Sequence, residues 1–443
     1  MLRDVPHVRQ RTDFCGEACA EMAMRRLGKA VDQNAVFSLT GLAPEQGRGA
    51  YTKELKSALE KMGFEVGPVW HQVAAANVDA ELKRLWAGVY QDLVQGQPSI
   101  VCTHFDESPN TTEHFRLVVG YDAKTDEVVY HDPAVDNGAY LRMKRSRFFG
   151  LWPLRYDSDT WTVIRFRLEP KNLAPPAPTP ARFSKADYAQ HVIELRRKFD
   201  IEGFHVIVQP PFVVVGDESE EVVRRRAEQT VKWTVDRLKQ DYFEVDPNHI
   251  LTIWLFKNRD SYRSHAQAFF GEPPSTPYGY YSSTHRALVM NIATGGGTLV
   301  HELVHPFVES NFPDCPAWFN EALGSLYEQC GDHQGRIWGY TNWRLAGLQQ
   351  AIRAGTVPSF EQLLSTNDNQ FYREDPGTNY AQARYLVYYL QEKGLLVRFY
   401  REFHTNRAAD PTGIRSLKRI LGKEDLVSFQ KQWEAYVLGL RFQ

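Results

Sequence analysis

Hydrophobic and polar residues alternate with two different periods in the first 170 residues of the chain. Apolar residues recur at helical spacing in 14–27, 52–62 and 79–95. Shorter alternating or apolar runs predict strands at 99–104, 115–121, 127–131 and 161–168. The turn residues 122–126 join two of these runs and predict a hairpin. Helices followed by a small antiparallel sheet predict an α+β domain.

The pattern after residue 200 predicts a small sheet followed by a helical lobe. The predicted strands are 205–209, 212–216, 250–256 and 287–292. Between them, 218–240 and 259–270 have helical spacing, and 278–281 is expected to be a loop. From Thr298 onward the spacing is almost entirely helical.

A proline-rich stretch separates these two regions. Five prolines fall within the eleven residues from Pro170 to Pro180. Such a composition favours extended polyproline geometry and cannot enter a helix or the interior of a sheet. We therefore expect residues 170–182 to form a semi-rigid linker between an N-terminal domain, 1–169, and a C-terminal domain, 183–443.

Composition and charge narrow the function classes. Lys and Arg number 52 and Asp and Glu 54 among 443 residues, and this net charge of −2 argues against a nucleic acid or an anionic membrane as the main partner. The longest apolar runs, 250–256 and 385–390, are far shorter than the ~20 residues that span a bilayer, so no transmembrane segment is expected. Residues 1–6 lack the apolar core of a signal peptide. We expect a soluble chain, cytoplasmic if Met1 is the true start and exported if an upstream signal is missing.

The segment His301-Glu302-Leu-Val-His305 has the spacing of a zinc site. Residues four apart on a helix lie one above the other, so both imidazoles can reach one metal ion from the same face. Glu302 lies beside them, where a carboxylate can take a proton from water. Without further context, the bland alternative is a helix with polar positions on one side.

A catalytic zinc ion needs three protein ligands and one open position. A metzincin would have Gly at position 308 and His at 311, whereas this chain has Val308 and Asn311, which excludes that class. Glu321, on the next predicted helix, can supply a carboxylate. Glu309 is its rival, but it lies two turns beyond His301 on the same helix and would overshoot a shared ion.

These motifs resemble the gluzincin clan of zinc metallopeptidases. The resemblance rests on the His301–His305 motif followed by Trp318-Phe-Asn-Glu321-Ala-Leu-Gly, and it extends over about residues 203–400. It implies a zincin-like domain that binds Zn²⁺. By this resemblance the ligands would be His301, His305 and Glu321, the general base Glu302, and the phenol that steadies the oxyanion Tyr380. The chain departs from the clan at Ala322, where Gly is preferred, and at Ser325, where many members have an acid that orients a ligand histidine.

The N-terminal region carries the residues of a different chemistry. Five cysteines are too few and odd in number for a disulfide framework, but Cys15 opens a predicted helix, where the helix N-terminus lowers a thiol's pKa. Gln10 can donate to an oxyanion from five residues upstream. His114 begins one predicted strand and Asp132 ends its neighbour, so paired antiparallel strands can bring them together.

This order of residues resembles the papain-like double-glycine (bacteriocin-processing type) cysteine peptidase family over about residues 3–168. The resemblance implies that Cys15 is the nucleophile, His114 the base, Asp132 the residue that orients it, and Gln10 the oxyanion residue. The chain departs from the family at Glu17, where relatives often have Pro or Val, and in its shorter gap between Gln10 and Cys15.

The sequence thus favours a multidomain α+β hydrolase that acts on a peptide or protein substrate at both a thiol and a zinc site. Two alternatives stay open. One is a peptide-binding or regulatory protein in which one or both peptidase folds do not cleave, and the other is a thiol-dependent amidase or acyl-transfer enzyme. Substrate specificity and oligomeric state are not fixed by the sequence.

Overall fold

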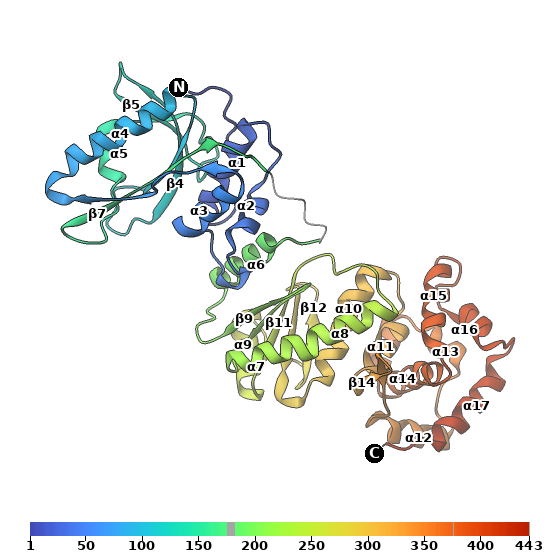
Figure 1. Cartoon of the computed structure of the whole chain (residues 1–443). Helices are drawn as coiled ribbons and strands as arrows, with labels where there is room; N and C mark the ends of the chain where they lie inside the picture. Colours follow the sequence, from blue (N-terminus) through green and yellow to red (C-terminus); the bar gives the residue numbers. More distant parts are fainter. Residues whose placement is uncertain (175–181, 375, 443) are drawn as a thin grey trace. The chain divides into compact units, whose positions relative to one another are not determined.

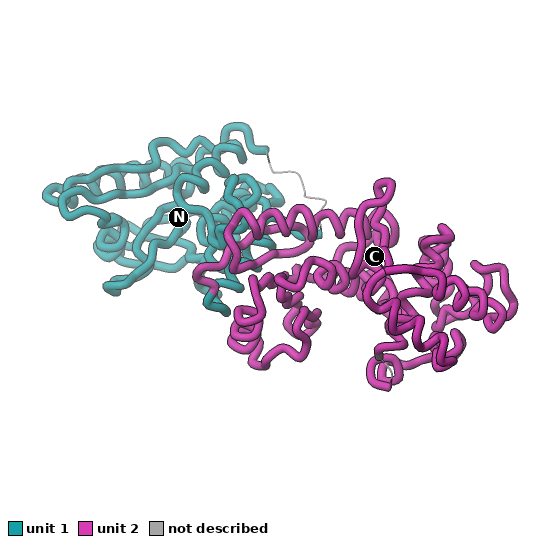
Figure 2. Tube along the Cα trace, turned by 90° about the horizontal axis from the view of Figure 1, so that it is seen from below, with its two compact units in different colours: residues 1–200 teal, residues 201–443 magenta. Residues whose placement is uncertain are grey.

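The chain forms two compact units, Met1–Asp200 and Ile201–Gln443 (Figures 1 and 2). The computed structural model describes residues 1–174, 182–374 and 376–442. Residues 175–181, most of the expected proline-rich linker, lie outside the described residues. Each described helix falls short of the length and apolar character that crossing a membrane requires.

The first unit is built on a six-stranded antiparallel sheet in the order β2-β7-β3-β4-β5-β6. Its strands are β2 (Trp70–Ala74), β3 (Ser99–His104), β4 (Glu113–Asp122), β5 (Glu127–His131), β6 (Leu141–Lys144) and β7 (Thr160–Arg167). The four predicted strands and the hairpin between β4 and β5 are confirmed. The pattern missed the edge strands β2 and β6, and the short pair of β1 (Phe64–Glu65) and β8 (Glu169–Pro170).

Helices of the first unit pack against this sheet or against one another. They are α1 (Cys15–Arg26), α2 (Gln33–Thr40), η1 (Pro44–Gln46), α3 (Thr52–Lys61), η2 (Ala75–Asn77), α4 (Val78–Val94), α5 (Arg145–Leu151) and α6 (Lys185–Lys198). Helix α1 contacts strands β3 and β4, and Cys19, Ala20, Ala23 and Met24 on it are part of the core. Because α1 is almost entirely buried, its first residue is held in place relative to β4.

Helix α6 belongs to the first unit, which corrects the expected domain boundary at residue 183. Its apolar face, Ala186, Ala189 and Ile193, forms one buried cluster with Phe14 and other residues of the first unit. Ser184 and Asp187 cap the helix reciprocally, so its start is defined by local sequence. The composition of residues 170–182 could not predict on which unit the following helix packs.

The second unit contains a five-stranded mixed sheet in the order β12-β13-β11-β10-β9. Its strands are β9 (His205–Gln209), β10 (Phe212–Gly216), β11 (Leu251–Phe256), β12 (Gly279–Ser282) and β13 (Ala287–Asn291). Strands β10, β11 and β13 are parallel to one another, and both edge strands are antiparallel to their neighbours. Residues 278–281 were expected to be a loop, but most of them form the edge strand β12.

A helical lobe follows the sheet, as predicted, except for a hairpin of β14 (Cys330–His333) and β15 (Arg336–Gly339). Before the lobe, the predicted helix 218–240 consists of α7 (Glu220–Arg226), the π-helical segment η3 (Ala227–Lys232) and α8 (Trp233–Asp241). The remaining helices are α9 (Arg259–Phe270), η4 (Ile292–Thr294), α10 (Gly297–Asn311), α11 (Ala317–Leu326), α12 (Arg344–Ala354), α13 (Phe360–Leu364), η5 (Gln370–Glu374), α14 (Pro376–Glu392), α15 (Leu396–Asn406), α16 (Ile414–Leu421) and α17 (Leu426–Gly439). The sheet and the lobe share one hydrophobic core that includes Trp318 and Phe403.

Substitution of Ile193 tests the assignment of α6. Ile193 is 2% exposed, and truncating a buried Ile to Ala typically costs about 2–5 kcal/mol. We expect I193A to shift the unfolding of the first unit to lower urea concentration. Pulse alkylation during the titration separates the units, because Cys19 is buried in the first core whereas Cys330 packs against the second.

The matched control is E194A, at an exposed position of the same helix. It should leave both transitions in place. If I193A instead advanced the exposure of Cys330, or left the exposure of Cys19 unchanged, α6 would not be part of the first unit.

Candidate active sites

A cavity of 950 Å³ in the first unit is lined by Gln10, Cys15 and His114 together. Cys15 is the first residue of α1, and His114 lies near the start of β4, where its side chain is buried. Tyr51, Trp70 and Tyr156 also line this cavity, and all three are exposed. Three of the four residues expected for a thiol site are thus brought to one hollow with aromatic walls.

The fourth residue, Asp132, is hydrogen-bonded to the imidazole of His114. His114 Nε2 lies 2.7 Å from Oδ1 of Asp132, which directly follows β5. Burial raises the pKa of Asp132, but the hydrogen bond and charge of His114, followed by the charge of Arg116, outweigh it and bring the pKa down to about 2. Since the carboxylate is ionised and can only accept, Nε2 of His114 carries a proton, and Nδ1 is the nitrogen that can act as a base.

Arg116 completes this arrangement and was not foreseen from the sequence. It lies two residues after His114 and therefore on the same face of β4, and its Nε donates to Oδ2 of Asp132 at 2.9 Å. Its guanidinium also donates to the carbonyl oxygens of His104 and Phe105 at 3.0 and 2.8 Å. The spacing His114-x-Arg116 on a strand is the sequence signal that could have revealed it.

Two observations refine the roles of Cys15 and Gln10. Burial raises the pKa of the Cys15 thiol to about 12, which is opposite to the lowering expected at a helix N-terminus. The thiol is therefore neutral at rest and depends on a base to lose its proton. The side chain of Gln10 makes no hydrogen bond within the described part of the chain, and its Oε1 is buried without a partner. Its amide is thus not committed to a structural bond.

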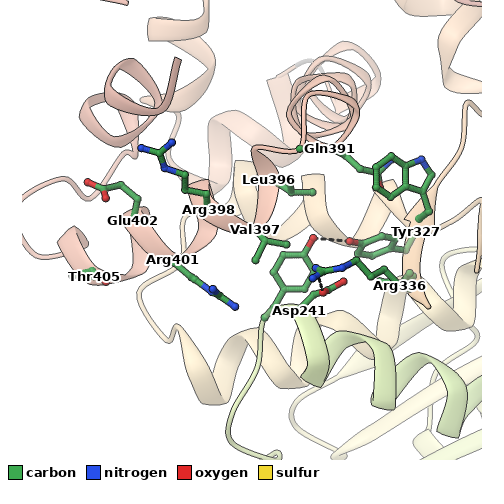
Figure 3. A pocket seen from close by; sticks show the side chains of 14 residues that line it. Asp241, Tyr327, Arg336, Gln391, Leu396, Val397, Arg398, Arg401, Glu402 and Thr405 are labelled. Atoms are coloured by element: carbon green, nitrogen blue, oxygen red, sulfur yellow. Dashed lines mark hydrogen bonds and ion pairs between the residues drawn. The ribbon is translucent and has the colours of Figure 1, made fainter. Parts of the chain in front are cut away.

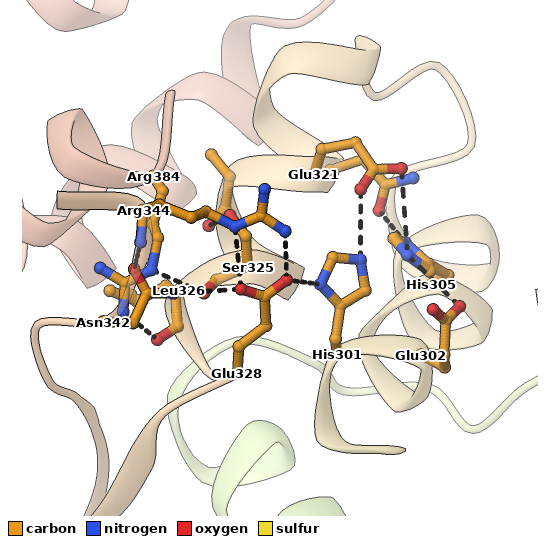
Figure 4. Close-up of polar contacts among 12 residues, drawn as sticks. His301, Glu302, His305, Glu321, Ser325, Leu326, Glu328, Asn342, Arg344 and Arg384 are labelled. Carbon is orange, nitrogen blue, oxygen red and sulfur yellow. Dashed lines mark hydrogen bonds and ion pairs between the residues drawn. The ribbon is translucent and has the colours of Figure 1, made fainter. Parts of the chain in front are cut away.

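In the second unit, His301, Glu302 and His305 bring three potential ligand atoms within 4.8 Å of one another on α10. The carboxylate of Glu321 on α11 faces both rings: Oε2 lies 3.2 Å from Nε2 of His301, and Oε1 lies 4.0 Å from Nε2 of His305 (Figure 4). All four side chains are mostly shielded from solvent. Two imidazole nitrogens and one carboxylate around a common point are a donor set that fits Zn²⁺.

The opposite nitrogens of both rings face fixed acceptors. Nδ1 of His301 lies 3.2 Å from Oε1 of Glu328, and Nδ1 of His305 lies 2.9 Å from Oδ1 of Asn320 (Figure 4). Arg344 donates to both oxygens of Glu328, at 3.0 and 2.8 Å. The departure at Ser325 therefore does not leave His301 without an acid beside it, because Glu328, three residues further on, faces its Nδ1.

Glycines allow this close approach of backbone and side chains. A Cβ on Gly324 of α11 would lie 3.2 Å from the ring of His301, and one on Gly297 would lie 2.0 Å from the carbonyl oxygen of Glu328. Side chains at these positions would separate α11 and the residues after it from α10. The two glycines thus permit Glu321 and Glu328 to reach the same imidazole from two sides.

Tyrosines surround the carboxylate of Glu321. The hydroxyl of Tyr372, in η5, donates to Oε1 of Glu321 at 2.8 Å and was missed in the sequence, because the isolated Tyr stands in no motif. Tyr380 lines both cavities that adjoin His301 and Glu302, of 840 and 550 Å³. The rival ligand Glu309 accepts a hydrogen bond from Tyr281 at 2.9 Å and is not part of the compact donor group found in the described residues.

Comparison with known proteins bears on the first unit. Residues 2–158 match the model of the Peptidase_C39 like family, a range that includes Gln10, Cys15, His114 and Asp132. No curated protein matches the chain. Among solved structures the chain is similar to the peptidase domain of Streptococcus ComA, described as a bi-functional ABC transporter involved in a quorum-sensing pathway. The two are 19% identical, the match covers 37% of this chain and 97% of that domain, and the TM-score is 0.25.

The protonation of His131, which directly precedes Asp132, should change the free energy of unfolding with pH. His131 is fully buried, and burial together with the charge of His7 lowers its pKa to about 4. An unfolded histidine titrates near 6.5, so the unfolded state binds the proton first. The contribution of His131 is therefore complete above about pH 6.5 and falls by up to roughly 3 kcal/mol as the pH drops toward 4. We expect H131F to remove this loss from unfolding free energies measured in urea.

Glu17 provides a control of opposite sign. Burial raises its pKa to about 7, so it adds stability as the pH falls from 7 toward 4.5. The E17Q variant should thus lose stability more steeply than wild type on acidification. Equal slopes for H131F and wild type between pH 6.5 and 4 would contradict the assignment to His131.

Proposed function

We propose that the chain is a peptide hydrolase whose first unit uses a Cys15–His114–Asp132 site. The observation that carries this proposal is the 2.7 Å pair of His114 and Asp132 at a cavity that Cys15 and Gln10 also line. The match of residues 2–158 to the Peptidase_C39 like family supports it. Bound substrate would lie along this cavity, against its exposed aromatic side chains.

The chemistry follows from these positions. Nδ1 of His114 takes the thiol proton, and Sγ of Cys15 forms a bond to the carbonyl carbon of the substrate. The oxygen becomes negative, and the amide of Gln10 donates a hydrogen bond to it. His114 then returns the proton to the leaving amine as the C–N bond breaks, and water releases the acyl group from Cys15. Asp132 keeps the imidazole in one tautomer and stabilises its charged form.

The raised pKa of Cys15 makes this proton transfer the decisive step. Because burial raises the pKa of the Cys15 thiol to about 12, little thiolate is present at neutral pH, and the thiol depends on His114 to lose its proton.

We propose zinc-dependent peptide hydrolysis at the second unit as a further activity. The specific observation that favours it is the carboxylate of Glu321 facing Nε2 of both His301 and His305. A bound Zn²⁺ would supply Lewis acidity, polarising a carbonyl and lowering the pKa of water. Glu302, beside both rings, would take the proton from the attacking water and pass it to the leaving amine.

Peptide binding at this second site has a structural basis in β12. This strand lies at one edge of the sheet, and its residues Tyr280 and Tyr281 line a cavity shared with His305. An extended peptide can pair with such an edge through main-chain hydrogen bonds. Tyr380, which lines the same cavity, would donate to the developing oxyanion. A non-cleaving binder would form no product, and a thiol amidase would cleave an amide other than a peptide bond. Cleavage assays therefore distinguish both alternatives from these proposals.

Substitutions in the first unit should stop cleavage that persists in the presence of a metal chelator. We expect C15A to abolish it and H114A to lower the rate by about two to four orders of magnitude, because the general base is lost. The assay is mass spectrometry of a mixed peptide library. Alkylation with iodoacetamide should modify Cys15 before the buried Cys19 and Cys102, because Cys15 lines the cavity beside the base His114, and H114A should slow that reaction.

The matched control is C102S. Cys102 lines the same cavity but is 1% exposed and lies on β3. C102S should cleave at the wild-type rate. Binding of peptides without any cleavage by wild type, or equal losses in C102S and C15A, would identify the unit as a binding module.

Substitutions in the second unit should separate metal binding from catalysis. The purified chain should hold about one zinc ion, which H305A should remove. E302Q should keep the zinc and lose chelator-sensitive cleavage by about two to four orders of magnitude. E328Q should weaken zinc binding by about 10–100-fold, since it loses the charge behind His301.

Glu309 supplies the control on the same helix, outside the donor group. E309Q should retain zinc with wild-type affinity. Zinc that stays substoichiometric after metal is added, or an unchanged rate in E302Q, would refute the activity of the second site without affecting that of the first.

A further inference from the structure

A third cavity, of 660 Å³, lies in the second unit apart from the residues around His301. It is enclosed by the end of α8, strand β15 and helix α15 (Figure 3). Its polar lining comes from Asp241, Tyr242, Tyr327, Arg336, Gln391, Arg398, Arg401, Glu402 and Thr405. None of these residues belongs to the two hydrolytic sites proposed above.

The cavity carries an excess of positive charge. Asp241 is paired with Arg336 at 2.5 Å, and Glu402 is paired with Arg419, so both carboxylates are neutralised. Arg398 and Arg401 make no hydrogen bond or ion pair within the described ranges, and both are exposed. They lie three residues apart on α15 and so on one face of that helix. Two guanidinium groups therefore remain available to an anion.

Arg401 is directed at the inner end of the cavity. In Figure 3 its side chain extends from α15 toward Asp241. Burial raises the pKa of Asp241, and the positive charges of Arg336, Arg401 and Arg237 oppose this effect, which is consistent with a guanidinium nearby. Because Arg336 already donates a hydrogen bond to the carboxylate of Asp241, the N–H groups of Arg401 remain available to another acceptor.

A buried phenol adds a neutral donor at the same end. The hydroxyls of Tyr242 and Tyr327 lie 2.7 Å apart, and the two side chains are 9% and 1% exposed. Each hydroxyl has one proton, but their mutual bond uses only one of the two. No acceptor for the second proton is present among the described residues. Because both tyrosines line the cavity, this O–H is available to donate to a ligand oxygen there.

The remaining walls are apolar. Ile337, Leu396 and Val397 line the cavity together with the indole of Trp338, whose Nε1 donates to Glu392. A compact inorganic ion would leave this surface uncovered. The lining therefore matches a molecule with an anionic group at one end and an apolar or aromatic body at the other.

We propose that this cavity binds a small organic anion, a carboxylate or a phosphate ester, with its charged oxygens at Arg401 and its apolar body against Leu396 and Val397. Carboxylates and phosphates share the geometry that guanidinium groups recognise, so both chemistries are included. The site is independent of peptide hydrolysis, since it shares no residue with either proposed active site.

Calorimetric titration of the full chain tests this proposal. The probes are phenyl phosphate and phenylacetate. Two control ligands each lack one feature: inorganic phosphate has no apolar group, and benzyl alcohol has no charge. We expect at least one of the two aryl anions to bind saturably, and to bind more tightly than inorganic phosphate or benzyl alcohol. R401Q should weaken this binding at least tenfold, because hydrogen bonds to charged groups contribute about 1.5–3 kcal/mol.

The control variant is R353Q, which removes an exposed arginine of α12 outside the cavity. It should bind like wild type. V397W, which fills the apolar wall, should weaken the aryl anions more than inorganic phosphate. The proposal is overturned if neither aryl anion binds saturably, if benzyl alcohol binds as well as they do, or if R401Q and R353Q have the same affinity.

Discussion

An acceptor beside the second nitrogen of a histidine ring fixes the orientation and tautomer with which the ring acts as a base or a metal ligand. Each candidate site of this chain provides such an acceptor with a buried carboxylate or amide. Asp132 lies behind His114, Glu328 behind His301 and Asn320 behind His305. Arginines in turn hold the two acids: Arg116 binds Asp132, and Arg344 binds Glu328. Without these outer bonds the rings could rotate or change tautomer, and the reacting nitrogen would be undefined.

The same buried surroundings act on the ionisation of Cys15 and Glu302. Burial opposes the charge on Cys15 and so raises the pKa of its thiol. In the second unit, burial also raises the pKa of Glu302, whereas the rings of His301 and His305 lower it. In both units burial thus favours the neutral form of the side chain, and a neighbouring positive charge favours its ionised form.

The sequence allowed the local features to be predicted, because spacing along one element determines which side chains share a face. The pair His301 and His305 on α10, and the two strands that join His114 to Asp132, follow from helical and strand periodicity. Contacts between distant segments were not predictable in this way. Glu328 and Tyr372 stand in no motif, and their roles depend on how α11 and η5 pack against α10.

Strand β12 and helix α6 were missed in the sequence for related reasons. β12 is an edge strand of only four residues that begins with Gly, and pairing with β13 makes it a strand. No helix was predicted over 185–198, and the partner of its apolar face lies far away in the sequence. Phe14 and Phe37, which stack against each other at 5.0 Å, form the surface that receives it.

The position of α6 changes what the proline-rich segment connects. Strand β8 precedes the proline-rich segment and helix α6 follows it, and both belong to the first unit, so the segment connects two elements of one unit rather than two units. The covalent passage to the second unit comes later, at Asp200–Ile201. A protease that cut within the prolines would therefore not release the Cys15 region, because α6 would still be bound to it through its apolar face and the ion pairs Arg11–Asp187 and Asp13–Arg197. The nicked protein would remain a noncovalent complex of its two fragments.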